Sequence, residues 1–381
     1  MKKQLITLAT ATAMAAPVAV LADSHDDGMG WFDLYGQVHT SLDNEGYDNV
    51  DGDSGSLTLH DHSSRIGIRG EKGLDTGVEA FYQLEQAIHW HDFQSLQEDI
   101  LDADRGLRDT FVGLRDEQLG ELRYGRLPWL NNVVYGPGNF FPLQAGDPGN
   151  VISAAVNPVA GDGFPANPGR AGFTEYETDE ANPDNAVNDT QDAVQYTTPD
   201  LGAFGASLTV HPSHINDAGD QEHNFMAIGT YNEGPLSVQA TFFQWHYTAD
   251  DDMSALVGSA EYDFGGMRIG GGGLAASNDA DDQDNNAVWL GGDMDVTNRG
   301  TVKAQLAQHL ADASDSDTLM MAVGYDFQLA EQTKLYANLV WFDNDDQANV
   351  APHSYATSAT TTDVGLGEDG TVTSFGVHHH F

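Results

Sequence analysis

The feature that most constrains the fold is a two-residue alternation of apolar and polar side chains that recurs along most of the chain. Near the C-terminus, Leu335, Leu339 and Trp341 fall on one face of an extended segment, and Lys334 and Asn338 fall on the other. A period of two is the signature of a β-strand with one apolar face. The alternation therefore predicts an all-β protein.

Sixteen segments carry this pattern, separated by turn residues. The predicted strands cover residues 31–42, 62–72, 76–92, 105–116, 119–127, 191–198, 202–212, 222–233, 235–248, 253–264, 267–277, 286–298, 301–313, 316–329, 332–345 and 370–381.

The connections between these segments alternate in length. Short turns such as 73–77, 117–120 and 233–235 join every second pair, whereas the other connections are mostly longer and rich in Asp, as in 278–285. Short turns on one rim and long loops on the other are typical of an up-and-down barrel in a membrane. Strands in lipid must pair every backbone polar group, so the sheet has to close. We expect a 16-stranded antiparallel transmembrane β-barrel; a soluble sandwich is the alternative that the alternation alone leaves open.

The N-terminus has the features of a secretory signal peptide. Lys2 and Lys3 precede an apolar stretch from Leu5 to Leu21, and small residues follow where cleavage would fall. We expect residues 1–22 to be a signal peptide and residues 23–381 to form the barrel domain.

Acidic residues dominate the charge. The formal net charge is −44, with 59 Asp and Glu against 15 Lys and Arg, and there is no cysteine. A surface of this charge repels nucleic acid, which excludes nucleic-acid partners. The sequence contains no nucleophile elbow, phosphate loop or His-Glu-x-x-His motif, so we expect neither an enzyme nor a cofactor.

Several short motifs, in order along the chain, carry a family resemblance. They are Leu34-Tyr35-Gly36-Gln37-Val38, Ser63-Ser64-Arg65-Ile66-Gly67-Ile68-Arg69-Gly70, Gly77 to Glu85, Phe111-Val112-Gly113-Leu114, Tyr124-Gly125-Arg126, Tyr325-Asp326 with Leu335-Tyr336-Ala337, and the terminal Phe381. Together the mature chain resembles the general-diffusion porins of Gram-negative bacteria.

The resemblance implies a function and partners. A chain of this family would sit in the outer membrane, among lipid and lipopolysaccharide, and pass small hydrophilic solutes and ions by diffusion. It would form a homotrimer, and the barrel assembly machinery would read Phe381 in the last strand as an assembly signal. The third loop, here residues 128–190, would fold into the lumen as a constriction loop. A segment so long is usually functional.

Basic side chains are concentrated where the resemblance places the pore wall. Seven of the ten arginines lie between Arg65 and Arg126. Ile66 and Ile68 would face lipid, so Arg65 and Arg69 would face the lumen; a lipid-facing Arg at mid-depth costs about 2–4 kcal/mol. We expect Arg65, Arg69, Arg108 and Arg126 to form a basic wall at the constriction, facing carboxylates of the loop.

The candidate loop carboxylates are Asp147, Asp162 and Glu175, although a solvated loop position is an equally good interpretation of each. The acidic excess predicts a preference for cations. A channel specific for sugars or small acids is the alternative function. An outer-membrane enzyme or adhesin on the same scaffold is a third possibility.

Histidines occur in short runs. His378, His379 and His380 precede Phe381, and alternation would turn His378 and His380 inward. The pair His60 and His62 could ligate a metal from one strand face. Exposed histidines at a loop edge are the commoner outcome, and the Asp-rich loops match no calcium-loop spacing, so no metal site is expected.

Overall fold

The computed structural model describes residues 32–47, 56–88, 108–128, 136–156, 190–215, 221–248, 251–278, 283–352 and 364–381. Within them the chain forms one antiparallel sheet and one short helix, α4 (Gly149–Ala155). The strands are β1 (Asp33–Tyr47), β2 (Ser56–Asp61), β3 (Arg65–Gly73), β4 (Glu79–Ala87), β5 (Thr110–Asp116), β6 (Gly120–Pro128), β7 (Thr190–Thr197), β8 (Phe204–Ile215), β9 (Gln221–Glu233), β10 (Leu236–Thr248), β11 (Asp251–Asp263), β12 (Met267–Asn278), β13 (Gln283–Thr297), β14 (Gly300–Ala311), β15 (Thr318–Ala330), β16 (Thr333–Asn344) and β17 (Gly370–His380).

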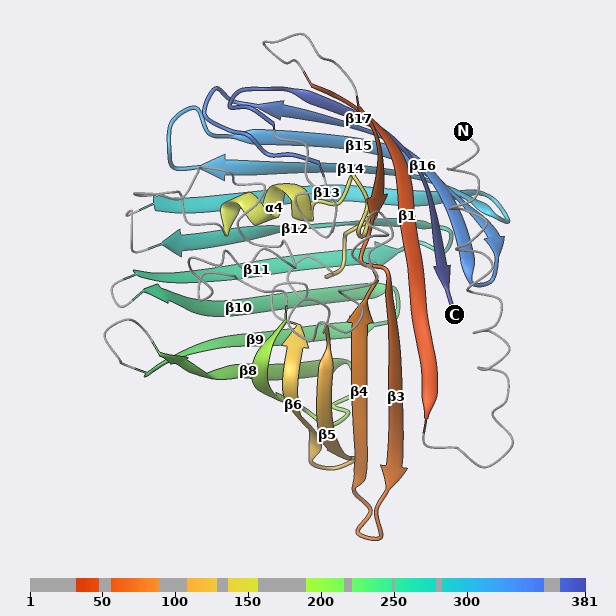
Figure 1. Cartoon of the computed structure of the whole chain (residues 1–381), viewed down its shortest axis with the longest axis vertical. Helices are drawn as coiled ribbons and strands as arrows, with labels where there is room; N and C mark the ends of the chain where they lie inside the picture. The colour runs from red at the N-terminus through yellow and green to blue at the C-terminus, as the bar shows by residue number, and fades with distance from the viewer. Residues whose placement is uncertain are drawn as a thin grey trace.

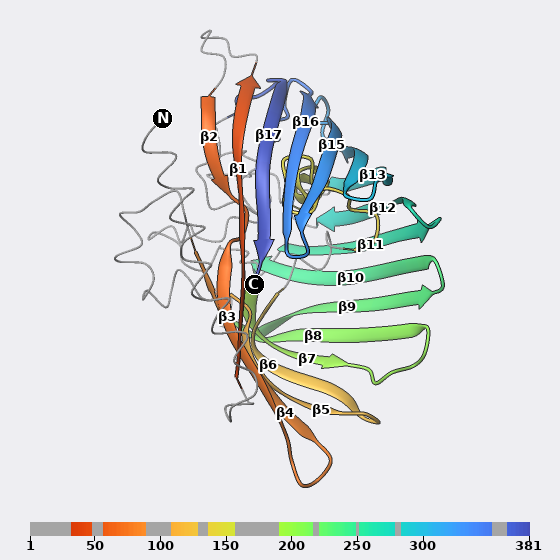
Figure 2. The ribbon, with the colours of Figure 1, turned by 90° about the vertical axis from the view of Figure 1, so that its right-hand side faces the viewer.

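The sheet closes on itself. From β3 onward each strand pairs with the next in sequence, and β1 pairs with β17 on one side and with both β2 and β3 on the other. Figure 1 shows the strands wrapping around a central space, and in Figure 2 β1, β17 and β16 lie side by side at the seam. Because β2 and β3 both follow β1, they are two parts of one barrel strand. The predicted 16-stranded antiparallel barrel is confirmed.

The second barrel strand is broken at residues 62–64. Ser63 adopts a φ of 60°, and the Asp61 carboxylate accepts a hydrogen bond from the Ser64 N–H at 3.0 Å. Short polar side chains of this kind favour turns, because they bond to the backbone locally. The sequence predicted one strand over 62–72; instead β2 precedes the break, and β1 continues to Tyr47 beside it.

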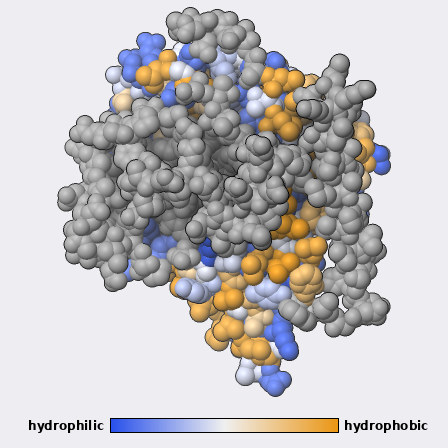
Figure 3. Space-filling model, viewed as in Figure 1, coloured by the Kyte–Doolittle hydropathy of each residue, from blue (hydrophilic) through white to orange (hydrophobic). Residues whose placement is uncertain are grey.

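Apolar side chains cover the outside of the barrel. Leu42, Leu256 and Leu306 are exposed on it, each flanked in its strand by buried neighbours, and Leu290 and Phe375 are exposed as well. In Figure 3 apolar side chains gather over the lower part of the molecule, where β3 to β6 lie, and the β3–β4 turn at its tip is hydrophilic. An exposed apolar belt of this extent requires hydrocarbon around it.

Part of the long connection between β6 and β7 lies against the inner face of the sheet. Residues 136–156 include α4, every residue of which is buried, and α4 contacts β12, β13, β14 and β15. In Figure 1 the helix lies over β12 and β13 and runs roughly along them. Ile152 and Phe141 belong to one apolar cluster with inward-facing residues such as Trp289, Met320 and Val340. The inner face is therefore mainly apolar where this segment covers it.

None of the helices among the described residues is long and apolar enough to cross a membrane.

Candidate functional site

On the inner face, the Glu85 carboxylate of β4 contacts two of the predicted arginines. Glu85 Oε2 lies 3.3 Å from Arg65 Nε, and Glu85 Oε1 lies 3.1 Å from Arg108 Nε. The Tyr35 hydroxyl donates to Glu85 Oε2 at 2.9 Å. Glu85 and Arg108 are buried, whereas the Arg65 side chain is 29% exposed. One negative charge thus faces two positive charges, and Arg65 stays accessible from the interior.

Strand register builds this cluster. Tyr35 on β1 lies opposite Gly67 on β3, and Gly67 lies opposite Glu85 on β4. A side chain at Gly67 would collide with the Tyr35 ring, which passes within 2.4 Å of the position a Cβ would occupy. The glycine therefore lets Tyr35 reach across β3 to the carboxylate.

A second charged cluster lies near the short turns of the same wall. Arg115 contacts Glu79 and Glu121 at 2.8 Å each and Glu71 at 3.7 Å. Arg123 also pairs with Glu121, and its guanidinium lies 5.8 Å from the centre of the Phe81 ring. Carboxylates outnumber cations in this cluster.

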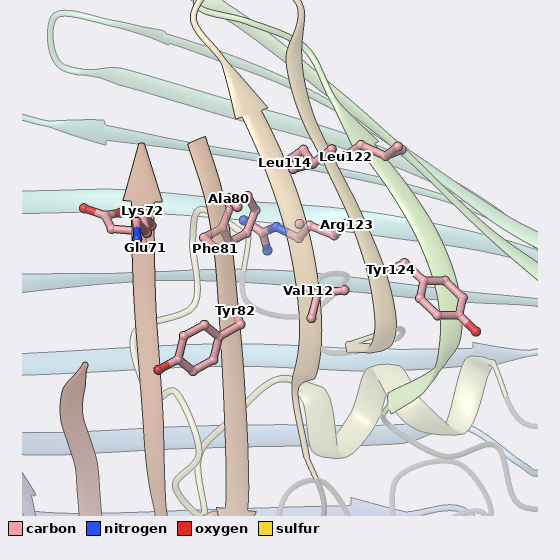
Figure 4. Close-up of a pocket in the computed structure, with 11 residues that line it drawn as sticks. Glu71, Lys72, Ala80, Phe81, Tyr82, Val112, Leu114, Leu122, Arg123 and Tyr124 are labelled. Atoms are coloured by element: carbon pink, nitrogen blue, oxygen red, sulfur yellow. The ribbon is translucent and has the colours of Figure 1, made fainter. Parts of the chain in front are cut away.

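Side chains of the same strands extend to opposite faces of the wall. Figure 4 shows Arg123 and Phe81 extending toward each other, whereas Tyr82 and Tyr124 extend away from them. The residues belong to a hollow lined by β3 to β6. Charged and apolar side chains thus alternate within each strand, as the period of two predicts.

Across the barrel, charges occur where the wall meets residues 136–156. Lys303 Nζ contacts Asp326 Oδ1 at 2.8 Å and donates to Gln144 Oε1 at 2.8 Å, while Lys334 Nζ lies 3.0 Å from Asp326 Oδ2. The Gln144 oxygen also accepts from Asn338 Nδ2 at 2.9 Å. Gln144 thus links the segment to β14 and β16.

Asp147 lies inside the segment and bonds to the segment itself. It accepts hydrogen bonds from Leu143 N–H (2.6 Å), Gly149 N–H (2.8 Å) and Asn139 Nδ2 (3.0 Å). The side chain is fully buried, which raises the pKa of Asp147 to about 7, while the hydrogen bonds act in the opposite direction. These contacts hold the turn before α4, and none of these hydrogen-bond partners of Asp147 is a predicted wall arginine.

The other predicted site residues lie apart from the Glu85 cluster. Arg69 faces inward but pairs with Asp33 at 3.0 Å, and its side chain is 56% exposed. Arg126 alternates with the buried Leu127 and falls on the same side of β6 as the exposed Leu122 and Tyr124. Asp162 and Glu175 lie outside the described residues.

Four charged residues of the inner wall were not singled out in the sequence, and one of them, Glu85, is the partner of two that were. Glu85, Arg115, Glu121 and Arg123 all occupy the inner positions of their strands, on the same side as Phe81 and Phe111. Alternation within each strand could have found them. Which inner residues meet across strands depends on register, and the sequence gives register poorly.

Comparison with known proteins decides the family. The family model described as Gram-negative porin matches residues 9–347. The chain belongs to the Gram-negative porin family. Over the full length of both chains it is 26% identical to outer membrane porin protein 32 of Delftia acidovorans. It is 33% identical to the major outer membrane protein P.IB of Neisseria meningitidis over 151 residues, which are 38% of this chain and 39% of the relative.

Solved porins share the fold. An anion-selective porin from Comamonas acidovorans superposes with a TM-score of 0.67 at 22% identity, covering 92% of this chain and 99% of that one. OmpT of Vibrio cholerae, in its trimer form, superposes with a TM-score of 0.60 at 16% identity, with 92% and 99% covered. This porin is thus a β-barrel of a Gram-negative outer membrane and a diffusion channel, not an enzyme.

Proposed function

We propose that this porin is a passive, cation-preferring pore for small hydrophilic solutes and ions, narrowed by its third loop and assembled as a homotrimer. The observation that carries the pore itself is the Arg65–Glu85–Arg108 cluster on an inner wall whose outer face is apolar; the cation preference rests on the charge balance of the chain as a whole. Fixed charges around an aqueous bore order water and sort solutes by charge.

The third loop supports a narrowed pore. Residues 136–156 pack on the inner faces of β12 to β16, so they occupy space within the ring of strands. Arg65 and Arg108 lie on other strands, and their carboxylate partner is Glu85 of the wall itself. We infer that the constriction lies between the loop segment and the β3–β5 wall.

The charge balance supports a cation preference. The formal net charge is −44, and in the cluster near the short turns Arg115 faces three carboxylates. Fields from such groups extend about 8–10 Å at physiological salt, a distance comparable to the scale of a pore. The Comamonas porin, which shares the fold, is anion-selective by name. Selectivity is therefore the property to measure first.

The test is the reversal potential of the purified porin in planar bilayers under a KCl gradient. We expect a cation preference that strengthens in Arg65→Ser, because Glu85 then keeps only Arg108. Arg126→Ser is the matched control: it removes the same charge from the other side of β6, so the reversal potential should stay within error of the wild type. Anion preference in the wild type would overturn the cation assignment.

The same recordings test for a specific channel. Ohmic currents without block by added sugars or dicarboxylates fit general diffusion. Saturable block by one solute would instead favour the substrate-specific alternative.

A further inference from the structure

Two carboxylates and an imidazole meet on the inner wall, away from the arginine cluster. They belong to Asp43 and Glu45 on β1 and His60 on β2, and all three side chains are buried. His60 Nε2 lies 2.5 Å from Glu45 Oε1 and 4.0 Å from Asp43 Oδ2. One nitrogen therefore faces two oxygen donors.

Register explains why the three groups converge. Asp43 and Glu45 are two residues apart and so share the inner face of β1, and His60 lies opposite Ser41, the next inner residue. The strand break at 62–64 ends β2 directly after this position. The sequence predicted exposed loop-edge histidines at His60 and His62; this is wrong, because β1 extends past residue 42 and covers both.

The spacing of the donor atoms suits a single ion. One donor atom from each of the three side chains lies within 4.8 Å of the others. Bonds of Zn²⁺ to oxygen and nitrogen are about 2.0–2.2 Å, so two ligands of one tetrahedral ion lie roughly 3.4 Å apart. A bound ion would therefore separate the His60 Nε2 and Glu45 Oε1 atoms, which are 2.5 Å apart without it, and draw the wider pairs inward.

A buried hydroxyl lies beside the cluster. Ser374 on β17 is opposite Asp43 in register and is fully buried, and its Oγ has no hydrogen-bond partner among the residues that the structure describes. Buried polar atoms are nearly always hydrogen-bonded, to protein, water or a ligand. A bound ion, or a water on that ion, would give the Ser374 hydroxyl a partner beside Asp43.

Further imidazoles continue from His60 along the wall. The rings of His60 and His62 lie 6.2 Å apart, those of His62 and His39 4.8 Å, those of His39 and His378 4.3 Å, and those of His378 and His380 4.1 Å. The row runs across β2, β1 and β17. Nitrogen donors therefore extend the cluster toward the rim where the chain ends.

We propose that Asp43, Glu45 and His60 bind a divalent first-row transition-metal ion such as Zn²⁺ on the pore wall. Imidazole favours Zn²⁺, Cu²⁺ and Ni²⁺ over Mg²⁺ and Ca²⁺, and the two buried carboxylates supply the compensating charge. Three protein ligands leave one position of a tetrahedral ion open for water. The site does not depend on the proposed ion selectivity.

The test is calorimetric titration of the full-length, detergent-purified porin with ZnCl₂. We expect one site per chain in the wild type, and at least tenfold weaker binding in both His60→Asn and Asp43→Asn. His309→Asn is the matched control, since His309 is also buried on the inner wall but bonds to Asn285. It should bind as the wild type does. Circular dichroism before and after heating checks that each variant is a folded barrel.

Two results would overturn the site. One is the absence of zinc binding by the folded wild type. The other is wild-type affinity in both His60→Asn and Asp43→Asn, which would place any bound zinc on the acidic loops. A functional readout is independent of calorimetry: zinc adds positive charge to the wall, so it should reduce cation current in the wild type and not in His60→Asn. Without zinc, His60→Asn should have the same ion selectivity as the wild type. Failure of the zinc site and failure of the proposed function can therefore be told apart.

Discussion

The two sides of the barrel interior differ in what covers them. The charged wall, formed by β3 to β6, presents Arg65, Glu85, Arg115, Glu121 and Arg123, which form ion pairs with one another, across strands for Arg65–Glu85 and Arg115–Glu121 and within β6 for Arg123–Glu121. The covered wall, formed by β11 to β16, presents mainly apolar side chains beneath residues 136–156: Val257, Leu274, Trp289, Ala307, Met320, Ala322 and Val340. Both walls have the same apolar outer face. The walls differ only in their inner faces, which are mainly apolar where residues 136–156 pack and charged where they do not.

The energetics of the two walls differ accordingly. Packing the segment on the covered wall removes apolar surface from water, which stabilises it by about 25 cal/mol per Å². Ion pairs on the charged wall contribute little where solvent reaches them, commonly about 0–1 kcal/mol. We infer that the covered wall holds the loop and the charged wall tunes the current.

Placing a charge between the loop and the covered wall should produce the largest change. Ile152 in α4 is 1% exposed, so Ile152→Asp buries a carboxylate without a partner, at a cost of roughly 3–5 kcal/mol. The segment should leave the wall, and single-channel conductance should rise by about a factor of two or more as the lumen clears. Bilayer recordings of single channels measure this.

Pro142→Asp is the control for that substitution. Pro142 lies in the same segment but is exposed, so an aspartate there keeps its water and the loop should stay docked. Equal conductance of Ile152→Asp and the wild type would contradict the role of the covered wall.

Removing the shared carboxylate of the charged wall should have the next largest effect. Glu85→Gln leaves Arg65 and the buried Arg108 without this counter-charge. The reversal potential should shift toward anions, and the folded barrel should lose about 1–3 kcal/mol of stability. Glu79→Gln is the comparison, since Arg115 keeps Glu121 there, so its shift should be smaller. An equal shift in both variants would mean that only total charge matters.

The smallest expected effect is a pH dependence of loop docking. The pKa of Asp147 is about 7 in the docked loop and 3.8 ordinarily, so the docked state binds the proton more tightly. Docking is therefore most favourable near pH 4 and weakens as the pH rises to 7. Conductance should be higher at pH 8 than at pH 5, by less than the change in Ile152→Asp. Asp147→Asn should remove the dependence; its persistence there would assign it to another group.

The strand count and the direction of each strand's faces could be predicted from the sequence, because alternation is a local property. Arg65 and Arg69 face inward as the neighbouring isoleucines indicate. The break at Ser63 could not be predicted, since besides the local Asp61–Ser64 bond it rests on the bond from the Ser64 hydroxyl to the His39 carbonyl of β1, which forms only once the strands are paired.

The pairing of charges could not be predicted either. Arg65 and Arg108 meet Glu85 because of a register set across three strands and a glycine that admits a tyrosine ring. Asp147 is acidic and lies in the long loop, which made it a candidate for the pore. Its hydrogen bonds to its own segment are a matter of local turn geometry that acidic character does not reveal.

Phe381, which directly follows β17, bonds to the first strand where the ring of strands closes. Gly36 and Phe381 exchange two backbone hydrogen bonds, of 3.0 and 3.1 Å, and the Phe381 ring fills the space where a side chain on Gly36 would lie. This contact joins positions 345 residues apart, so it cannot form until the last strand has reached the first. While this contact is absent, the sheet has two unmatched edges whose backbone groups would lie unpaired in hydrocarbon. An open pore therefore requires the two ends of the sheet to meet.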